Sequence, residues 1–370
     1  MSPFFSVIVP LYNREDIIDR TLNSVIEQSV CKEIIIVDDC STDNSLAKVK
    51  EYSKKYDHIR VITHDNNLGA GGARNSGVSV AQGEYILFLD SDDWFEDGAF
   101  IELKKEIEAN NQPDLVVFSF NRVGENNQII TTENKKLENN KGRYSGRSIF
   151  ESFVQGIINP SPWNKAYKCE FWRNNKFRFV EKMPHDDFVL MPYISRKAQT
   201  ATILNSRLYN YFEHSSNITN SISDYKIECS TLTAVKMREN ILNDSSISDV
   251  YEDDLNRIAY KHFHSGFRAR RKLCSDKQIK NWIWLIIQYN ATYKVSTEFI
   301  HCCDRARMLF ALFFLETKER GIAIETFFSD SEAEKKELMQ IIDIELGRLK
   351  MKKGKSRIFK CIKSSILRSM

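Results

Sequence analysis

The stretch IIIVDDCSTD at residues 34–43 decides the fold of this chain. Four consecutive β-branched residues end in two aspartates, and a polar segment follows them at once. A similar arrangement stands earlier, where FSVIVPLYN at residues 5–13 also carries an apolar run into polar residues. Short, continuous apolar runs of this kind are typical of strands that helices cover on both faces. We therefore expect both runs to be strands of a buried, parallel sheet.

The same alternation continues outward through the first 120 residues. Apolar runs that predict strands recur at residues 5–9, 33–37, 59–63, 85–89 and 115–120, and segments with helical spacing lie between them at residues 14–28, 43–56, 71–81 and 97–110. Repeated βαβ units of this length predict an α/β fold, with a mostly parallel sheet flanked by helices in three layers. The polar residues 121–147 are expected to form a long loop or a hairpin insertion.

The second half of the chain has a helical pattern. Helical spacing appears at residues 226–242, 251–274, 276–289, 298–316 and 331–349. The sequence thus predicts an α/β domain at residues 1–220, a helical C-terminal domain at residues 221–345 and a basic amphipathic tail at residues 346–370.

Composition places the chain among ordinary globular proteins. Of its 370 residues, 42% are hydrophobic and 28% are charged, which excludes a mostly disordered chain. Eight cysteines are too few and too scattered for a disulfide scaffold, and no two of them have Cys-x-x-Cys zinc spacing. No apolar run is long enough to span a membrane, and the first residues lack the pattern of a secretion signal. We therefore expect a cytoplasmic protein.

The net charge of +3 hides a strongly basic tail. Residues 346–370 hold nine Lys and Arg and no acid, while the rest of the chain holds 44 basic and 50 acidic residues. Five apolar residues of the tail share one face of a helix: Ile358, Phe359, Ile362, Ile366 and Leu367. A basic amphipathic helix predicts peripheral attachment to the anionic inner face of the cell membrane. A solvated end without structure is the alternative. Nucleic-acid binding is not expected, because the tail has one aromatic residue and the remaining chain is acidic.

Polar residues follow four of the predicted strands at the point where each strand ends. They are PLYN at residues 10–13, DDCSTD at residues 38–43, NNLGAGGARN at residues 66–75 and DSDD at residues 90–93. Ligands of open parallel sheets bind beyond the carboxyl ends of the strands. Aspartate oxygens suit Mg²⁺ or Mn²⁺, and such an ion neutralises a diphosphate. The sequence therefore predicts a site for a nucleotide diphosphate and a divalent cation.

Other classes of phosphate-binding protein do not fit these loops. The glycines at Gly69 and Gly71 are followed by Arg74 where the dinucleotide fingerprint has glycine, and the chain has no P-loop motif. A sugar nucleotidyltransferase normally carries a basic, glycine-rich loop after its first strand, and PLYN is not that loop. A nucleotide-sugar-binding protein without turnover is a further alternative. Loss of Asp92 or Asp187 would favour it, but both residues are present.

Together, the quoted strings resemble a family 2 glycosyltransferase with the GT-A fold. The match continues through LDSDD at residues 89–93, PWNK at residues 162–165, HDD at residues 185–187 and residues 209–219, so that it covers about the first 220 residues. It implies an inverting, metal-dependent transferase that moves a sugar from a nucleotide-diphospho-sugar, most often a UDP-sugar. The acceptor would be a hydroxyl of a bacterial surface glycan or a lipid-linked glycan. A processive synthase is not expected, because no Gln-x-x-Arg-Trp motif occurs.

The resemblance also implies which residues bind the nucleoside. Pro10 and Tyr12 would line its pocket, and Asp39 would hydrogen-bond the base. Either Asn66 or Asn67 would lie near the base, and the resemblance leaves this choice open. For Asp39, the alternative is a structural role as a loop cap.

A second group of residues would bind the diphosphate and the metal. Arg74 would lie near the diphosphate, Asp90 and Ser91 would contact the ribose or the sugar, and Asp92 would coordinate Mn²⁺ or Mg²⁺. The metal stabilises charge on the leaving nucleotide. His214 is a further candidate metal ligand, with a plain surface histidine as the alternative. For Arg74, the alternative is a surface ion pair.

The acceptor side would be formed by two other segments. Related transferases carry Glu-Asp with the Asp as general base, which makes Asp187 the candidate base and puts Asp186 in the place of the Glu. The alternative is that both acids only start a helix at its positive end. Trp163, Asn164 and Lys165 would shape the acceptor pocket, and core packing is the alternative for Trp163.

Overall fold

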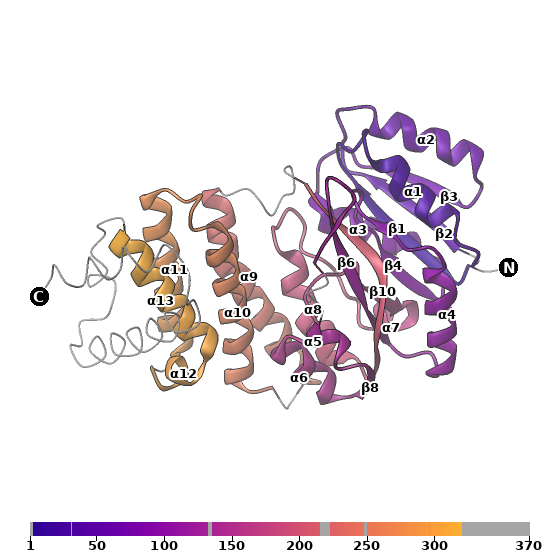
Figure 1. Cartoon of the computed structure of the whole chain (residues 1–370). Helices are drawn as coiled ribbons and strands as arrows, with labels where there is room; N and C mark the ends of the chain where they lie inside the picture. Colours follow the sequence, from indigo (N-terminus) through magenta and orange to yellow (C-terminus); the bar gives the residue numbers. More distant parts are fainter. Residues whose placement is uncertain are drawn as a thin grey trace, which may run out of the picture. The chain divides into compact units, whose positions relative to one another are not determined.

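A computed structural model describes residues 3–30, 32–131, 135–214, 223–247, 250–295 and 297–319 (Figure 1). The chain divides into two compact units, one of residues 1–220 with 235–247 and one of residues 221–234 with 248–370. All residues predicted for the site belong to the first unit. The helix predicted at residues 331–349 and the basic tail at residues 346–370 lie outside the described residues.

Four parallel strands form the first half of the sheet, as the sequence predicts. They are β1 (Phe5–Leu11), β2 (Lys32–Asp38), β3 (Ile59–Thr63) and β4 (Tyr85–Phe88), and they lie in the order β3-β2-β1-β4. The register of β1 and β2 pairs Leu11 with Asp38. These two strands therefore end at the same level, which brings the loops that follow them together at one edge of the sheet.

Helices cover both faces of these strands (Figure 1). α1 (Ile18–Ile26), α2 (Ser45–Lys55) and α4 (Ala99–Ala109) contribute to one core with Val7 and Ile34 of the sheet. α3 (Gly69–Val80) packs on β1, where a Cβ added to Gly77 would lie 2.4 Å from Cγ2 of Ile8. Side chains alternate between the faces of a strand, so two helical layers require apolar residues at nearly every position. This requirement explains the continuous apolar runs in the sequence.

The second half of the sheet is mixed. β9 (Lys165–Lys168) lies antiparallel between β4 and β6 (Leu115–Gly124), β10 (Thr200–Glu213) pairs parallel with β6, and β5 (Trp94–Phe95) pairs antiparallel with β10. The predicted fold class is confirmed, but only the strands from β3 to β4 form a continuous parallel sheet, because β9 runs antiparallel to both of its neighbours. The sequence analysis did not predict β5, β9 or β10. β5 and β9 have only two and four residues, which are too few to show a periodic pattern.

The segment at residues 121–147, predicted to be a long loop or a hairpin insertion, contains a hairpin, a short helix and a further strand. β6 extends to Gly124 and pairs with β7 (Ile129–Thr131), and the segment also holds α5 (Lys135–Glu138) and β8 (Gly142–Ser145), which pairs with β10. α6 (Arg147–Gln155), α7 (Cys169–Asn174) and α8 (Asp186–Lys197) complete the first unit as far as β10.

The C-terminal region is helical, as the sequence predicts. Its helices are α9 (Asp224–Leu242), α10 (Glu252–Arg270), α11 (Asp276–Tyr293), α12 (Thr297–Cys302) and α13 (Asp304–Glu319), so the single helix predicted at residues 298–316 is in fact two. Phe267 packs edge-on against Phe313 and Trp282, with ring centroids 4.5 and 5.3 Å away. No helix in the described part of the chain is long and apolar enough to cross a membrane.

Candidate functional site

A cleft of about 510 Å³ opens where β1, β2 and β4 end. Eight of the residues predicted for the donor site line it: Pro10, Tyr12, Asp39, Asn67, Arg74, Asp90, Ser91 and Asp92. The other lining residues are Leu11, Asn13, Arg14, Gly69, Ala70, Ala73 and Tyr211. Asn66 is not among them, so of the two candidates Asn66 and Asn67 it is Asn67 that lines the cleft.

The Asp39 carboxylate joins three segments of the chain at one wall of the cleft. Its Oδ1 accepts a hydrogen bond from the Leu68 amide at 2.8 Å, and its Oδ2 accepts one from the Gly69 amide at 2.7 Å. His64 Nδ1 lies 2.7 Å from Oδ1, and Asn67 Nδ2 donates to the Asp39 carbonyl at 2.9 Å. Asp39 therefore caps the start of α3. The structural role as a cap, which the sequence left as an alternative for Asp39, thus occurs together with its place in the cleft.

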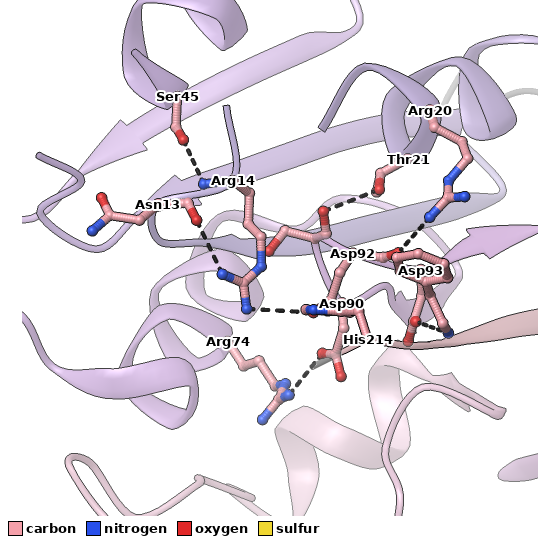
Figure 2. Close-up of polar contacts among 12 residues, drawn as sticks. Asn13, Arg14, Arg20, Thr21, Ser45, Arg74, Asp90, Asp92, Asp93 and His214 are labelled. Carbon is pink, nitrogen blue, oxygen red and sulfur yellow. Dashed lines mark hydrogen bonds and ion pairs between the residues drawn. The ribbon is translucent and has the colours of Figure 1, made fainter. Parts of the chain in front are cut away.

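Arg74 links the turn after β4 to the start of α8. Its Nη2 donates to Asp90 Oδ1 at 2.9 Å (Figure 2), and its Nη1 lies 3.5 Å from Asp186 Oδ2. The Arg74 side chain is only 7% exposed. Burial by itself lowers the pKa of Arg74, but the charges of Asp90 and Asp186 more than offset this effect and raise the pKa above its ordinary value. Arg74 is thus a buried, permanent cation at the cleft and not a surface ion pair.

Asp92 lies between two nitrogen donors. Its Oδ2 is 3.1 Å from His214 Nε2 and 3.4 Å from Arg14 Nη2 (Figure 2). Among the described residues, no group of three His, Cys, Asp or Glu side chains is placed to hold a metal ion. In nucleotide enzymes, however, Mg²⁺ is commonly held by one or two protein ligands, and substrate phosphates supply others. One carboxylate oxygen and one imidazole nitrogen in contact fit a site of that kind.

Two residues of α1 hold the backbone of the acidic turn, which is formed by residues 90–93 after β4. Arg20 Nη2 donates to the Asp92 carbonyl at 3.2 Å, and Thr21 Oγ1 donates to the Ser91 carbonyl at 3.1 Å (Figure 2). The Arg20 guanidinium also stacks on the Trp94 ring, 3.8 Å from its centroid, which restricts its position. The turn is therefore anchored through its carbonyls, and the carboxylates of Asp90 and Asp92 are left to interact with other side chains.

Asp93 ties the same turn to β10. Its fully buried carboxyl group accepts hydrogen bonds from the Tyr209 hydroxyl and the Phe212 amide, both at 2.7 Å. Burial raises the pKa of Asp93 well above its ordinary value, and the nearby charge of Asp92 adds to this shift. Because His214 stands two residues beyond Phe212, the connection through Asp93 also holds His214 close to Asp92.

α8 begins with Asp186 and Asp187, as the sequence predicts. Asp186 is buried and faces Arg74, whereas Asp187 is half-buried and accepts a hydrogen bond from the Phe188 amide at 2.8 Å. Burial raises the pKa of Asp186 to about 7, and burial also raises the pKa of Asp187. The two acids thus face different surroundings. The raised pKa of Asp186 lies near neutral pH, where a general base works best, and the pKa of Asp187 is shifted in the same direction.

The start of α8 is placed by close packing against α3. A Cβ added to Gly71 would lie 2.5 Å from Asp186 Oδ2 and 2.8 Å from the Val180 carbonyl, so only glycine allows this approach. Asn75 holds the same segment, because its side chain donates to the Phe179 carbonyl and accepts from the Phe179 amide, both at 2.9 Å. The glycine-rich helix therefore positions the two acids as well as one wall of the cleft.

Replacing Asp186 with asparagine is expected to change how stability depends on pH. The pKa of Asp186 is about 7 in the folded chain against an ordinary 3.8, so the folded chain binds this proton more tightly than the unfolded chain. Between these values, the free energy of unfolding of the wild type therefore falls as the pH rises. Asp186→Asn lacks this loss and should gain about 2–3 kcal/mol relative to the wild type between pH 5 and pH 8. Urea unfolding at both pH values measures the difference, and identical pH dependence in the two proteins would contradict the raised pKa.

The three residues predicted for the acceptor pocket lie in the interior. Trp163 is 7% exposed and stacks on Tyr209, with ring centroids 4.7 Å apart. Asn164 Nδ2 donates to the Phe118 carbonyl at 2.9 Å, and Lys165 Nζ donates to Asn164 Oδ1 at 2.7 Å. None of the three lines the cleft, and the packing of Trp163 matches the alternative of a core role.

Three residues that shape the site were not predicted from the sequence, namely Arg14, Arg20 and His64, and Asp93 was predicted only as part of the DSDD string. Arg14 directly follows the PLYN string, and His64 directly follows the strand predicted at residues 59–63, so extending each of these two segments by one residue would have included them. Arg20 and Asp93 act through contacts with segments far away in the sequence, namely the acidic turn and β10. No local pattern reveals such contacts.

Comparison with known proteins agrees with this geometry. Residues 6–171 match the family model described as Glycosyl transferase family 2. A poly(ribitol-phosphate) beta-glucosyltransferase of Bacillus spizizenii is 42% identical over 209 residues, which are 52% of this chain and 30% of that protein. EpsJ of Bacillus subtilis, described as an uncharacterized glycosyltransferase, is 30% identical over 236 residues, which are 59% of this chain and 64% of that protein. The chain thus spans less than two thirds of either relative.

A solved structure shares the fold. It is the crystal structure of residues 1–349 of TarS from Staphylococcus aureus in complex with UDP-GlcNAc, with a TM-score of 0.61 and 22% identity. The match covers 95% of this chain and 93% of that chain. This likeness identifies the fold of the first unit as the GT-A type.

Proposed function

We propose that this chain transfers a sugar from a nucleotide-diphospho-sugar to a hydroxyl of a bacterial surface polysaccharide, because residues 6–171 match the family model described as Glycosyl transferase family 2. The observation that carries the proposal is the composition of the cleft. Asp39, Arg74 and Asp92 line it together, and they provide an acceptor for the base, a cation for the diphosphate and a ligand for a metal.

The donor that fits best is a UDP-sugar. Asp39 presents a carboxylate at the cleft, which can accept a hydrogen bond from the N3–H group of uracil. Pro10 and Tyr12 line the same cleft, and Tyr12 is 46% exposed, so its ring is available to a nucleoside. TarS, which has the same fold, was solved with UDP-GlcNAc. Asp90 and Ser91 would then contact the ribose or the sugar, with Arg74 holding the Asp90 carboxylate in place.

A divalent cation is part of this proposal. Asp92 and His214 would hold Mn²⁺ or Mg²⁺, which supplies positive charge to the leaving diphosphate when it is bound. Arg14 contacts the same oxygen of Asp92 as His214 does, so its guanidinium neutralises the carboxylate in the structure described here. Arg74, which pairs with Asp90, contributes a second and permanent positive charge to the cleft.

Asp187 would take the proton of the acceptor hydroxyl. A sugar or polyol hydroxyl is a weak nucleophile near neutral pH and needs a base within hydrogen-bond reach. Asp187 is the more exposed of the two acids at the start of α8, whereas Asp186 faces Arg74. Direct attack from the side opposite the diphosphate would invert the configuration at the anomeric carbon. The names of two relatives suggest a ribitol-phosphate polymer as the acceptor.

A transfer assay tests this function. Purified protein is incubated with Mn²⁺ and one of several UDP-sugars, together with poly(ribitol-phosphate) or a lipid-linked glycan. We expect release of UDP that depends on the acceptor and a glycosylated product of inverted configuration, as measured by mass spectrometry and NMR. Binding of a UDP-sugar without transfer to any acceptor would instead favour a non-catalytic binding protein.

The basic tail would hold the enzyme at its acceptor. Nine Lys and Arg without an acid at residues 346–370 favour an anionic membrane surface, at about 1 kcal/mol for each basic residue near it. We expect the full chain to sediment with vesicles that contain anionic lipids and to be released by salt. A chain without residues 350–370 should stay in the supernatant. Equal sedimentation of both chains would contradict a membrane role for the tail.

A further inference from the structure

Two side chains connected by hydrogen bonds, His64 and Ser76, stand behind the Asp39 carboxylate. His64 Nδ1 lies 2.7 Å from Asp39 Oδ1, and His64 Nε2 lies 2.8 Å from Ser76 Oγ. The side chains of His64 and Asp39 are only 8% and 4% exposed. The three residues come from three places in the fold, namely the ends of β3 and β2 and the middle of α3. Their contacts therefore connect one wall of the cleft to the helix beside it.

The hydrogen bonds define which atoms donate and which accept. An ionised carboxylate only accepts, so the proton on His64 stands at Nδ1 and points to Asp39. In neutral His64, Nε2 then accepts from the Ser76 hydroxyl. Asp39 Oδ1 thus takes two hydrogen bonds, from His64 and Leu68, while Oδ2 takes one from Gly69. Both oxygens are held, and the carboxylate cannot turn without breaking one of these bonds.

One acceptor position of Asp39 is left for a ligand. A carboxylate has about four lone-pair positions, and the three donors named above occupy three of them. Within the described residues, Gly69 is the one hydrogen-bond donor to Oδ2. Because Asp39 lines the cleft, a bound base meets an acceptor whose position is fixed by these hydrogen bonds.

We propose that His64 and Ser76 are positioning residues that make the cleft select uridine over cytidine nucleotides. This inference rests on the proposed function, since it concerns the base of the nucleotide donor. Uracil carries an N–H donor at position 3, where cytosine carries a lone pair. A fixed carboxylate bonds the first and repels the second, whereas a carboxylate that can turn or take up a proton tolerates both. A hydrogen bond to a charged group corresponds to about a 10- to 100-fold difference in affinity.

Three substitutions of His64 separate its two hydrogen bonds. The amide nitrogen of asparagine stands as many bonds from Cβ as Nδ1, and that of glutamine as many as Nε2. His64→Asn can therefore still donate to Asp39, His64→Gln can still reach Ser76, and His64→Ala can do neither. Ser76→Ala removes only the hydrogen bond between Ser76 and His64. His58→Gln is the matched control, because His58 stands directly before β3 and does not line the cleft.

The experiment is titration calorimetry of each variant with UDP and with CDP in the presence of Mn²⁺. We expect the wild type to prefer UDP by at least about 10-fold. His64→Gln and His64→Ala should lose most of this preference, mainly through weaker UDP binding. His64→Asn should keep most of it, Ser76→Ala should show an intermediate value, and His58→Gln should match the wild type.

Other outcomes would overturn the inference. Equal losses of UDP and CDP affinity in His64→Gln would indicate a purely structural role, as would a preference that no variant changes. If His64→Gln and His64→Ala do not fold, His64→Asn and Ser76→Ala still decide the question. The preference for UDP over CDP must then be larger in His64→Asn than in Ser76→Ala, and smaller in Ser76→Ala than in the wild type. A wild type that binds CDP as well as UDP would contradict base selection but leave the transferase function standing. A wild type that binds neither would contradict the proposed function itself.

Discussion

Replacing Asp187 with asparagine is expected to lower sugar transfer by about 10²- to 10⁴-fold while UDP affinity in the presence of Mn²⁺ changes by no more than a few-fold. The physical reason is that an amide cannot take the proton of the acceptor hydroxyl. Asp187 does not line the cleft and makes its hydrogen bond to the neighbouring Phe188 amide, so the donor site should be unaffected. Single-turnover transfer and titration calorimetry with UDP measure the two effects separately.

The neighbouring acid provides the matched comparison. Asp186 stands next to Asp187 on the same helix, but it is buried and lies 3.5 Å from Arg74. Asp186→Asn should therefore affect transfer less than Asp187→Asn, because it removes a partner of Arg74 and not the base. If instead Asp186→Asn is inactive and Asp187→Asn transfers at nearly the wild-type rate, the base is Asp186.

The Asp92→Asn variant is expected to lose metal-dependent binding of the donor while its fold stays intact. An amide oxygen carries no net charge and is a much weaker ligand for Mn²⁺ than a carboxylate. The backbone of Asp92 is held by Arg20, so the turn should keep its shape when the side chain changes. Calorimetry of UDP binding with and without Mn²⁺ measures the effect, and circular dichroism checks the fold.

A surface aspartate serves as the control for this change of charge. Asp57 is exposed in the turn between α2 and β3 and does not line the cleft, so Asp57→Asn should bind UDP and Mn²⁺ like the wild type. A tenfold or greater gain of UDP affinity from Mn²⁺ that persists in Asp92→Asn would rule out Asp92 as the metal ligand.

Much of the first unit could be predicted from local sequence. The runs at β1 and β2 are long and apolar enough to indicate buried strands, and parallel strands bring their polar ends to one edge of the sheet. That rule alone placed Asp39, Arg74 and Asp92 at a common site, and the structure shows all three in one cleft. The start of α8 at Asp186 was equally readable, because two acids precede an apolar helical segment.

The remaining features depend on contacts between distant segments. Lys165 has the hydrophilic character of a surface residue, but the loop before β9 surrounds its ammonium group with oxygen acceptors from Asn159 and Asn164. Asp93 differs from Asp92 by one position in the turn, yet one is buried against Tyr209 and the other meets Arg14 and His214. Which of two adjacent acids turns inward is decided by the packing of β10, which has no strong local signal.

The central claim is that the cleft binds a nucleotide-sugar together with a divalent cation. Thermal unfolding of the wild type against a panel of UDP-, GDP-, CDP- and dTDP-sugars, each with and without Mn²⁺, tests it most directly. We predict that one or a few UDP-sugars raise the unfolding temperature, and that Mn²⁺ increases this shift because the ion and the diphosphate bind together. Absence of any shift across the panel, or a shift that Mn²⁺ leaves unchanged, would contradict the account.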